Sequence, residues 1–395
     1  MKAVKDEFIL QTYKRFDLTL VRGKGAICYD DQGCEFIDLT SGIGVNSLGF
    51  ANKKWLKAVK KQASKLQHTS NLFYTKPADK LARTLCKRSG YGGVFFANSG
   101  AEANEGAIKI ARKWAFDKAV SEGQGEGYKG EKSTILVVKN SFHGRTVTTL
   151  SATAQESFHN YFFPFTPGFK EASFAEAKEA IGEDVCAVMI EFIQGEGGVV
   201  AFEKEAVREL YEECQKRGVL FIADEVQTGV GRTGRLLASE HYGFTPDITT
   251  LAKGLGGGLP IGAVLVSHKL KGVLKFGDHG STFGSNPVVC AAAQAVLKSV
   301  DEDLLCGVRR RGEIVRELLS GCKEVKSVSG MGLMIGIELT TLNAREVAAE
   351  CIKRGVLCLT AKEKVRLLPP LNISVKQLTK AVKILRGVLE GQNQI

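Results

Sequence analysis

The sequence lacks the marks of metal-binding and disulfide-rich proteins. None of its 10 cysteines forms a Cys-x-x-Cys pair, and its six histidines lie at no ligand spacing near them. Such cysteine pairs are typical of zinc sites and redox motifs, and disulfide frameworks occur in oxidising compartments. The sequence therefore predicts no metal site and the reduced thiols of a cytoplasmic protein.

Long apolar segments are also absent. The N-terminus, Met1-Lys-Ala-Val-Lys-Asp-Glu7, has no signal-peptide hydrophobic region. No stretch approaches the ~18 uninterrupted apolar residues of a membrane-spanning helix. The sequence contains no repeat and no low-complexity segment. We expect a soluble intracellular protein without a membrane partner.

Basic residues are in excess, with 54 Lys and Arg against 43 Asp and Glu, a net charge of +11. This excess suits nucleic acids, anionic membranes or small phosphorylated and carboxylated ligands. Lysines recur at helical spacing between Lys53 and Lys65, as on a solvated helix face. The other dense run, Arg309 to Arg311, has no interleaved aromatic residues. Because no binding module accompanies the charge, we expect no nucleic-acid partner.

Six continuous apolar runs read as strands that are buried on both faces. They are Val94–Ala97, Ile135–Val138, Val185–Ile190, Val219–Ala223, Ile248–Ala252 and Ile261–Val266. Helical patterns separate several of these runs, and many of the 44 glycines lie at their ends. This arrangement predicts an α/β fold with a mostly parallel central sheet and helices on both faces.

The two ends of the chain have a different pattern. Short alternating runs between Val21 and Asp38 predict a small antiparallel unit. Beyond Pro287 an alanine-rich helix leads into mixed strands (333–338, 365–368) and helices (344–353, 376–389). We predict an N-terminal segment (1–45) that packs with a small C-terminal α+β domain (291–395), and a large α/β domain between them (46–290).

A helix start follows the first apolar run. Ser99 and Glu102 predict a capping box for a helix that reaches about Phe116, and Gly100 leaves room for a ligand at the free N–H groups. A phosphate suits this position. A capped helix without a ligand is the alternative.

Two charged residues adjoin later apolar runs. Lys253 precedes a cluster of glycines, and a confined amine loses hydration, so that its pKa falls and it can attack aldehydes. Asp224 ends a run of five apolar residues, where a carboxylate needs a cation such as a protonated pyridine nitrogen. The alternatives are a solvated loop lysine, and an ion pair or a helix cap at Asp224.

The stretch Gly229-Val-Gly-Arg-Thr-Gly234 fits the dinucleotide-binding pattern G-x-G-x-x-G. Its context differs from that motif, because Asp224 to Thr228 separate it from the strand. A dinucleotide-dependent oxidoreductase nevertheless stays open as a different class of enzyme.

Five motifs together resemble the class III pyridoxal-phosphate-dependent aminotransferases. The motifs span nearly the whole chain and are Asn98–Glu105, Ser141–Thr146, Ala223–Gly234, Leu251–Gly262 and His279–Pro287. Within that class, the stretches 69–74 and 41–49 most resemble the acetylornithine aminotransferases. The resemblance implies fold type I, a pyridoxal 5'-phosphate cofactor and a homodimer with active sites at the subunit interface.

The resemblance also implies roles for single residues around the cofactor. Lys253 matches the lysine that carries the cofactor as a Schiff base, and Asp224 matches the partner of the pyridine nitrogen. The other matches are Gln227 near the ring hydroxyl, Val226 and Phe142 on the ring faces, Ser99, Gly100 and Ala101 at the phosphate, and Thr282 reaching the phosphate from the other subunit.

On the substrate side, Arg145 and Ser281 match positions that hold acetylornithine, and Tyr13 matches a residue lining that pocket. Glu196 and Arg366 match a pair in which the glutamate covers the arginine for the amine donor and frees it for the 2-oxoacid. The implied reaction moves the terminal amino group of N2-acetylornithine to 2-oxoglutarate in a ping-pong cycle of arginine biosynthesis, which yields glutamate.

Several alternatives remain at this point. The donor could instead be succinylornithine, succinyldiaminopimelate, ornithine or 4-aminobutyrate. A mutase or decarboxylase with the same cofactor would share Lys253 and Asp224, and a basic nucleic-acid-binding protein would use the net charge.

Overall fold

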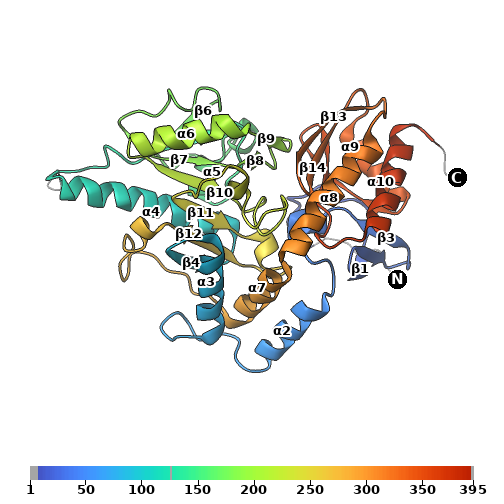
Figure 1. Ribbon diagram of the computed structural model, residues 1–395, viewed down its shortest axis with the longest axis horizontal. Coiled ribbons are helices and arrows are strands. Elements are labelled where there is room, and N and C mark those ends of the chain that lie inside the picture. The colour runs from blue at the N-terminus through green and yellow to red at the C-terminus, as the bar shows by residue number, and fades with distance from the viewer. Residues whose placement is uncertain (1–7, 125–126, 393–395) are drawn as a thin grey trace.

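A seven-stranded sheet forms the centre of the larger part of the molecule (Figure 1). The computed structural model describes residues 8–124 and 127–392. The strand order is β4 (Gly93–Ala97), β12 (Gly262–Val266), β11 (Ile248–Leu251), β10 (Leu220–Asp224), β7 (Val185–Ile190), β5 (Thr134–Val138) and β6 (Phe169–Ala172). Strand β12 is antiparallel to both neighbours, and the other pairs are parallel. The predicted mostly parallel α/β sheet is confirmed.

Each of the six apolar runs forms a strand because helices cover both faces of the sheet. In β5, Ile135 and Val137 pack in one core cluster with helix α4 (Gly100–Ser121). The alternate residues Leu136 and Val138 pack in another with α6 (Lys204–Lys216). Strand β6 was not predicted from the sequence, because it lies at the sheet edge and the residues in its centre are exposed.

Helix α4 continues beyond the predicted end near Phe116, because Ala119 is still buried in its last turns. Helices α3 (Lys76–Ser89) and α7 (Pro287–Ser299) contribute to a further core cluster beside β4 and β12. α2 (Lys53–Ala63) has no buried residue and carries lysines on its exposed side.

The N-terminal strands lie beside the C-terminal part of the chain (Figure 1). Strands β1 (Leu20–Lys24), β2 (Ile27–Asp30) and β3 (Glu35–Asp38) form the predicted antiparallel unit, and β15 (Val356–Leu357) pairs with β3 in parallel. The exact domain boundaries stay a prediction.

A second four-stranded sheet belongs to the C-terminal part. Its order is β13 (Val325–Met331), β14 (Met334–Leu339), β17 (Lys364–Leu367) and β16 (Leu359–Ala361). Helices α8 (Glu302–Leu319), α9 (Ala344–Lys353) and α10 (Val375–Leu389) share one core with it. The shorter elements are α1 (Ser41–Gly44), α5 (Val147–Ser151), β8 (Ile193–Gln194), β9 (Val200–Ala201), η1 (Glu156–Phe158), η2 (Ala238–His241), η3 (Lys253–Leu255) and η4 (His268–Leu270).

Among the helices of residues 8–124 and 127–392, none combines the length and apolar composition needed to cross a bilayer.

Candidate active site

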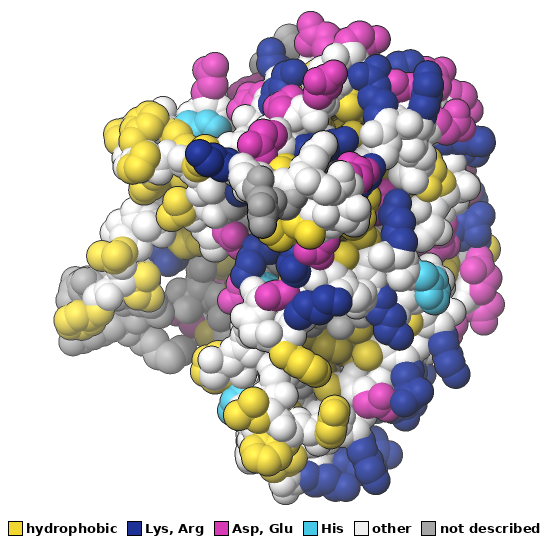
Figure 2. Space-filling model, turned by 90° about the vertical axis from the view of Figure 1, so that its left-hand side faces the viewer, with side chains coloured by type: hydrophobic (Ala, Val, Ile, Leu, Met, Phe, Trp, Pro, Cys, Tyr) yellow, Lys and Arg dark blue, Asp and Glu magenta, His cyan; other side chains and the backbone are white. Residues whose placement is uncertain are grey.

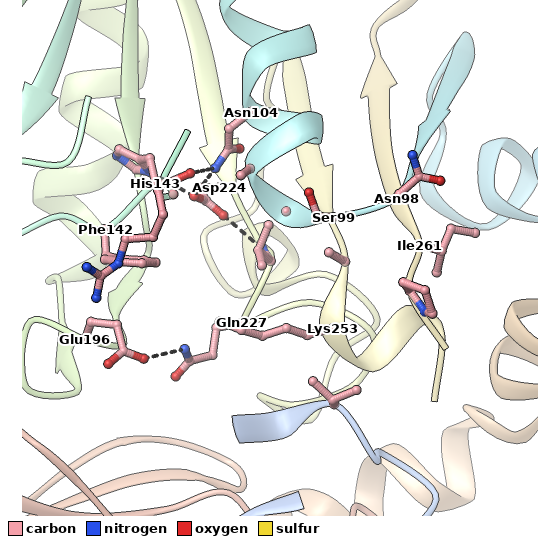
Figure 3. Close-up of a pocket in the computed structure, with 18 of the residues that line it drawn as sticks. Asn98, Ser99, Asn104, Phe142, His143, Glu196, Asp224, Gln227, Lys253 and Ile261 are labelled. Carbon is pink, nitrogen blue, oxygen red and sulfur yellow. Dashed lines mark hydrogen bonds and ion pairs between the residues drawn. The ribbon is translucent and has the colours of Figure 1, made fainter. Parts of the chain in front are cut away.

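A cavity of about 500 Å³ lies at the carboxyl ends of the central strands (Figure 3). Parallel sheets bind ligands at this edge, and the volume suits a small molecule or cofactor. Ten of the residues singled out in the sequence line the cavity: Ser99, Gly100, Ala101, Phe142, Arg145, Glu196, Asp224, Val226, Gln227 and Lys253.

Asp224 is the last residue of β10 and is 4% exposed. Its Oδ2 accepts a hydrogen bond from Asn104 Nδ2 at 2.8 Å and lies 2.8 Å from His143 Nδ1. The backbone N–H of Val226 donates to Oδ1 at 3.0 Å. A carboxylate offers about four acceptor positions, so Asp224 retains capacity for one cationic N–H from the cavity.

Sequence reasoning missed Asn104 and His143 as partners of Asp224. Asn104 lies one turn inside α4, and His143 lies within the Ser141–Thr146 motif. An asparagine and a histidine within two of the motifs were sequence signals for further site residues. The sequence did not indicate that both contact Asp224.

Lys253 follows β11 and begins the short helix η3. In the pairing of β10 with β11, Asp224 lies opposite Thr250, so Lys253 is three residues beyond its strand neighbour. The φ angle of Lys253 is +36°, a left-handed value that a non-glycine residue holds only when its surroundings enforce it.

Burial lowers the pKa of the Lys253 amine, while the carboxylates of Glu196 and Asp224 oppose this change. A larger fraction of the amine is therefore neutral near pH 7 than for an exposed lysine, and the neutral form is the nucleophile.

Helix α4 begins at the cavity, but its cap differs from the predicted capping box. Ser99 Oγ accepts the N–H of Glu102 at 3.1 Å, as expected. The Glu102 carboxylate instead accepts the N–H of Asn98 at 2.5 Å, one residue before the expected donor. The remaining N–H groups of the first helical turn, those of Gly100 and Ala101, have no partners inside the helix and remain suited to an anion.

Gly100 is needed where α4 meets the residue after Asp224. A Cβ at position 100 would lie 2.8 Å from Val226 Cγ1. Val226 and the helix start can therefore approach each other only because residue 100 has no side chain.

Phe142 is held at the cavity by a buried carboxylate that sequence reasoning missed. Glu191 Oε2 accepts the N–H of Phe142 at 3.0 Å, and its Oε1 accepts the N–H of Gly195 at 3.2 Å. Burial raises the pKa of Glu191 to about 7, with His143 lowering it and Asp224 raising it.

Glu196 and Arg366 form an ion pair beside the cavity. Arg366 Nη1 lies 2.6 Å from Glu196 Oε1, and Arg366 is 3% exposed. Gln227 contacts both side chains at 3.5 Å. Burial alone would raise the pKa of Glu196, but Arg366, with smaller contributions from Lys253 and Gln227, lowers it, and the net pKa is lowered. The pair is therefore charged at neutral pH.

Arg145 lies at the rim of the cavity with its guanidinium over two aromatic rings. Its Cζ is 4.1 Å from the ring centroid of Phe158 and 5.5 Å from that of Phe142. An exposed arginine held in this way can present its donors to a carboxylate in the cavity.

Arg366, which lies behind Glu196, and three further singled-out residues do not line the cavity. Tyr13 is 72% exposed, and Thr282 is exposed as well. Ser281 contacts the cavity indirectly, because its Oγ accepts Asn98 Nδ2 at 3.1 Å. The expected action of Thr282 from a second subunit stays a prediction.

The glycines of Gly229–Gly234 serve packing. A Cβ at Gly229 would lie 2.5 Å from Leu251 Cδ2, and one at Gly231 would lie 3.0 Å from Val300 Cγ1. The stretch forms turns and does not open a helix. It therefore lacks the strand–loop–helix context of a dinucleotide site.

Residues 9–389 match the family Aminotransferase class-III. An acetylornithine aminotransferase of Haemophilus ducreyi is 50% identical to this chain over 394 residues. The alignment covers 98% of each of the two proteins.

Two solved structures are similar over more than nine tenths of their length. An ornithine aminotransferase of Toxoplasma gondii, whose active site has partial occupancy of PLP, has a TM-score of 0.92 and 33% identity, with 98% of this chain and 92% of that chain covered. An N-acetylornithine aminotransferase of Stenotrophomonas maltophilia has a TM-score of 0.82 and 35% identity, with 96% and 97% covered. With a family match over nearly all its residues and a relative at this level of identity, the chain belongs to the class-III aminotransferases.

Proposed function

We propose that this chain is a pyridoxal-phosphate-dependent transaminase that moves the terminal amino group of N2-acetylornithine to 2-oxoglutarate in arginine biosynthesis. The observation that carries the proposal is the common cavity of Lys253 and Asp224, which lie at the ends of neighbouring strands. The acetylornithine substrate is supported by the 50% identical relative.

The residues present fit pyridoxal phosphate. Asp224 is a buried acceptor with spare capacity, Lys253 is an amine of lowered pKa, and the α4 start offers N–H groups beside the close contact at Gly100. When bound, the cofactor supplies an electron sink for the substrate carbon that loses a proton.

Each residue around the cofactor has a distinct task. Lys253 Nζ would hold the cofactor aldehyde and would take the proton that leaves the substrate carbon. The Asp224 carboxylate would accept the ring N–H and keep that nitrogen protonated. Ser99, Gly100 and Ala101 would bind the phosphate, Val226 and Phe142 would pack on the ring, and Gln227 would face the ring hydroxyl.

The substrate residues serve a donor and an acceptor in turn, as a ping-pong cycle requires. Arg145 binds a donor carboxylate, and Ser281 and Tyr13, which do not line the cavity of a single chain, are the further residues expected to bind the donor. Glu196 covers Arg366 while the donor is bound, and Arg366 receives a carboxylate of 2-oxoglutarate when Glu196 moves away.

The acting species is a homodimer, with Thr282 of one subunit reaching the phosphate bound by the other. A single chain exposes large apolar side chains, among them Leu72 (88%), Tyr74 (108%) and Phe276 (109%). Figure 2 shows hydrophobic side chains gathered in clusters on one face of the molecule. Such clusters favour burial against a second subunit. We expect this dimer in the cytoplasm.

A panel of donors with 2-oxoglutarate as acceptor tests the function. We expect N2-acetylornithine to give the highest kcat/KM among acetylornithine, succinylornithine, succinyldiaminopimelate, ornithine and 4-aminobutyrate. Lys253→Ala should abolish turnover while the protein keeps its fold, and Lys57→Ala, an exposed lysine of α2, should retain it. Undiminished transamination by Lys253→Ala would refute the proposal.

A further inference from the structure

The Gly229–Gly234 loop contains a buried arginine that the tasks above do not use. Arg232 is 2% exposed. Burial lowers its pKa to about 9, and the carboxylate of Asp38 opposes that change. Because burying a guanidinium is costly unless acceptors meet its donors, the partners of Arg232 indicate its role.

Arg232 holds the residue before strand β14 from two sides. Its backbone carbonyl accepts the N–H of Leu333 at 3.0 Å. Its Nη1 donates to the carbonyl of Leu333, also at 3.0 Å. Both peptide groups of Leu333 are thereby fixed to the loop, and with them the start of β14 at Met334.

The same guanidinium holds the chain that leaves strand β17. Nη1 of Arg232 also donates to the carbonyl of Pro369 at 2.6 Å. Pro369 and Pro370 have no backbone N–H. The flanking N–H groups bond elsewhere, Leu368 to the carbonyl of Leu39 at 2.7 Å and Leu371 to that of Ser47 at 2.8 Å. Arg232 therefore holds the chain at Pro369, between the hydrogen bonds that Leu368 and Leu371 make elsewhere.

The two strands that Arg232 holds are those that carry and flank Arg366. Arg366 lies on β17, opposite Gly336 of β14. Its guanidinium reaches Glu196, which lines the cavity and precedes Val200–Ala201 of β9. A shift of β14 against β17 would move the Arg366 side chain relative to the cavity.

We propose that Arg232 is the positioning residue of Arg366, holding the start of β14 and the end of β17 so that Arg366 meets the carboxylate of the 2-oxoacid acceptor. The proposal rests on the proposed function, in which Arg366 binds the acceptor. The donor residue Arg145 lies on a separate segment, after β5, so the effect of Arg232 is selective for the acceptor.

Steady-state kinetics of Arg232→Met and Arg232→Lys test the inference. For Arg232→Met we expect the KM for 2-oxoglutarate to rise at least about tenfold, with the KM for N2-acetylornithine within about threefold of wild type. Arg232→Lys should recover part of the acceptor affinity, because one ammonium can still donate to one of the two carbonyls.

Arg88→Met is the matched control. The guanidinium of Arg88 likewise donates to two backbone carbonyls, those of Leu297 at 2.5 Å and Val300 at 2.6 Å, but it joins α3 to the end of α7. Its loss should leave both KM values unchanged. Thermal melts and circular dichroism establish that each variant is folded, and Arg232→Lys decides the outcome if Arg232→Met does not fold.

The inference is overturned if folded Arg232→Met has an unchanged KM for 2-oxoglutarate, or if the KM values of both substrates are affected equally. Where Arg232→Met does not fold, an unchanged KM of folded Arg232→Lys overturns it. Failure of the proposed function is a separate result, since it would appear as a wild-type protein that does not transaminate 2-oxoglutarate.

Discussion

At the scale of single residues, the chemistry depends on Asp224 more than on any other carboxylate of the cavity. It lies at the end of β10, where three hydrogen-bond donors contact its carboxylate. Those donors hold its orientation, so the charge at Oδ1 can be directed at a ring nitrogen.

Asp224→Asn should lower kcat by roughly a thousandfold, because a neutral amide cannot keep a pyridine nitrogen protonated. Steady-state kinetics with N2-acetylornithine and 2-oxoglutarate measure this value. Asp117→Asn, which removes an exposed partner of Lys113 on α4, serves as the control and should stay within about twofold. A near-normal rate for Asp224→Asn would remove the assigned role.

The neighbouring Glu225 gives a pH-dependent prediction for stability. Burial raises its pKa to about 7, and the N–H groups of Ser239 and Ala238 oppose the shift. The folded protein therefore keeps a proton that the unfolded chain, with a pKa near 4.5, has released. Between these pH values the contribution of Glu225 to the free energy of unfolding falls as pH rises.

Glu225→Gln lacks this titration, so its stability relative to wild type should increase from pH 5 to pH 8 by on the order of 2 kcal/mol. Thermal melts across that range measure the difference. Glu209→Gln is the control, because Lys178 lowers the pKa of the exposed Glu209. If the difference in free energy of unfolding between wild type and Glu225→Gln does not change with pH, the prediction is wrong.

At the scale of elements, the apolar runs predicted the central strands well because burial on both faces leaves little choice of residue. The edge strand β6 could not be found in this way, since Lys170 and Glu171 at its centre are exposed. The Arg309–Arg311 run lies in α8, where Glu302 accepts from Arg309, and Glu313 and Glu317 accept from Arg310 at the surface.

The start of α4 gives a prediction at this scale. Gly100→Ala places a Cβ against Val226, so the helix start and the residue after Asp224 must separate. We expect pyridoxal phosphate to bind at least about tenfold more weakly, because the N–H groups and the carboxylate no longer fit one ligand. Equilibrium titration followed by absorbance measures the affinity.

Gly272→Ala is the matched control for that experiment. A Cβ at position 272 would meet no atom within 4 Å, and its φ is not in the left-handed range. Equal affinities of the two variants would show that the close approach at Gly100 is not required.

At the scale of the whole molecule, local patterns could not predict contacts between distant segments. The pairing of β3 with β15 and the bonds of Arg232 to Leu333 and Pro369 join residues far apart in sequence. The residues predicted to hold the cofactor, Thr282 excepted, line one cavity, because they lie in compact motifs at strand ends, and their roles there stay a prediction. Glu191 and His143 needed the fold to bring them to Phe142 and Asp224.

The proposed dimer gives a complementation test. Lys253→Ala and Thr282→Ala subunits should each have low activity as homodimers. When they are mixed and allowed to exchange, the hybrid dimer contains one site with Lys253 from one subunit and Thr282 from the other. Activity should then rise well above the sum of the two variants. No rise, with exchange verified by native mass spectrometry, would argue that Thr282 does not act across an interface.

The most direct test of the central claim is to locate the covalent bond between cofactor and protein. Wild-type protein is incubated with pyridoxal 5'-phosphate, treated with borohydride to make the bond permanent, digested and mapped by mass spectrometry. The modification should lie on Lys253, and the same treatment of Lys253→Ala should leave that peptide unmodified. A label confined to other lysines, or no label in a folded protein, would contradict the account.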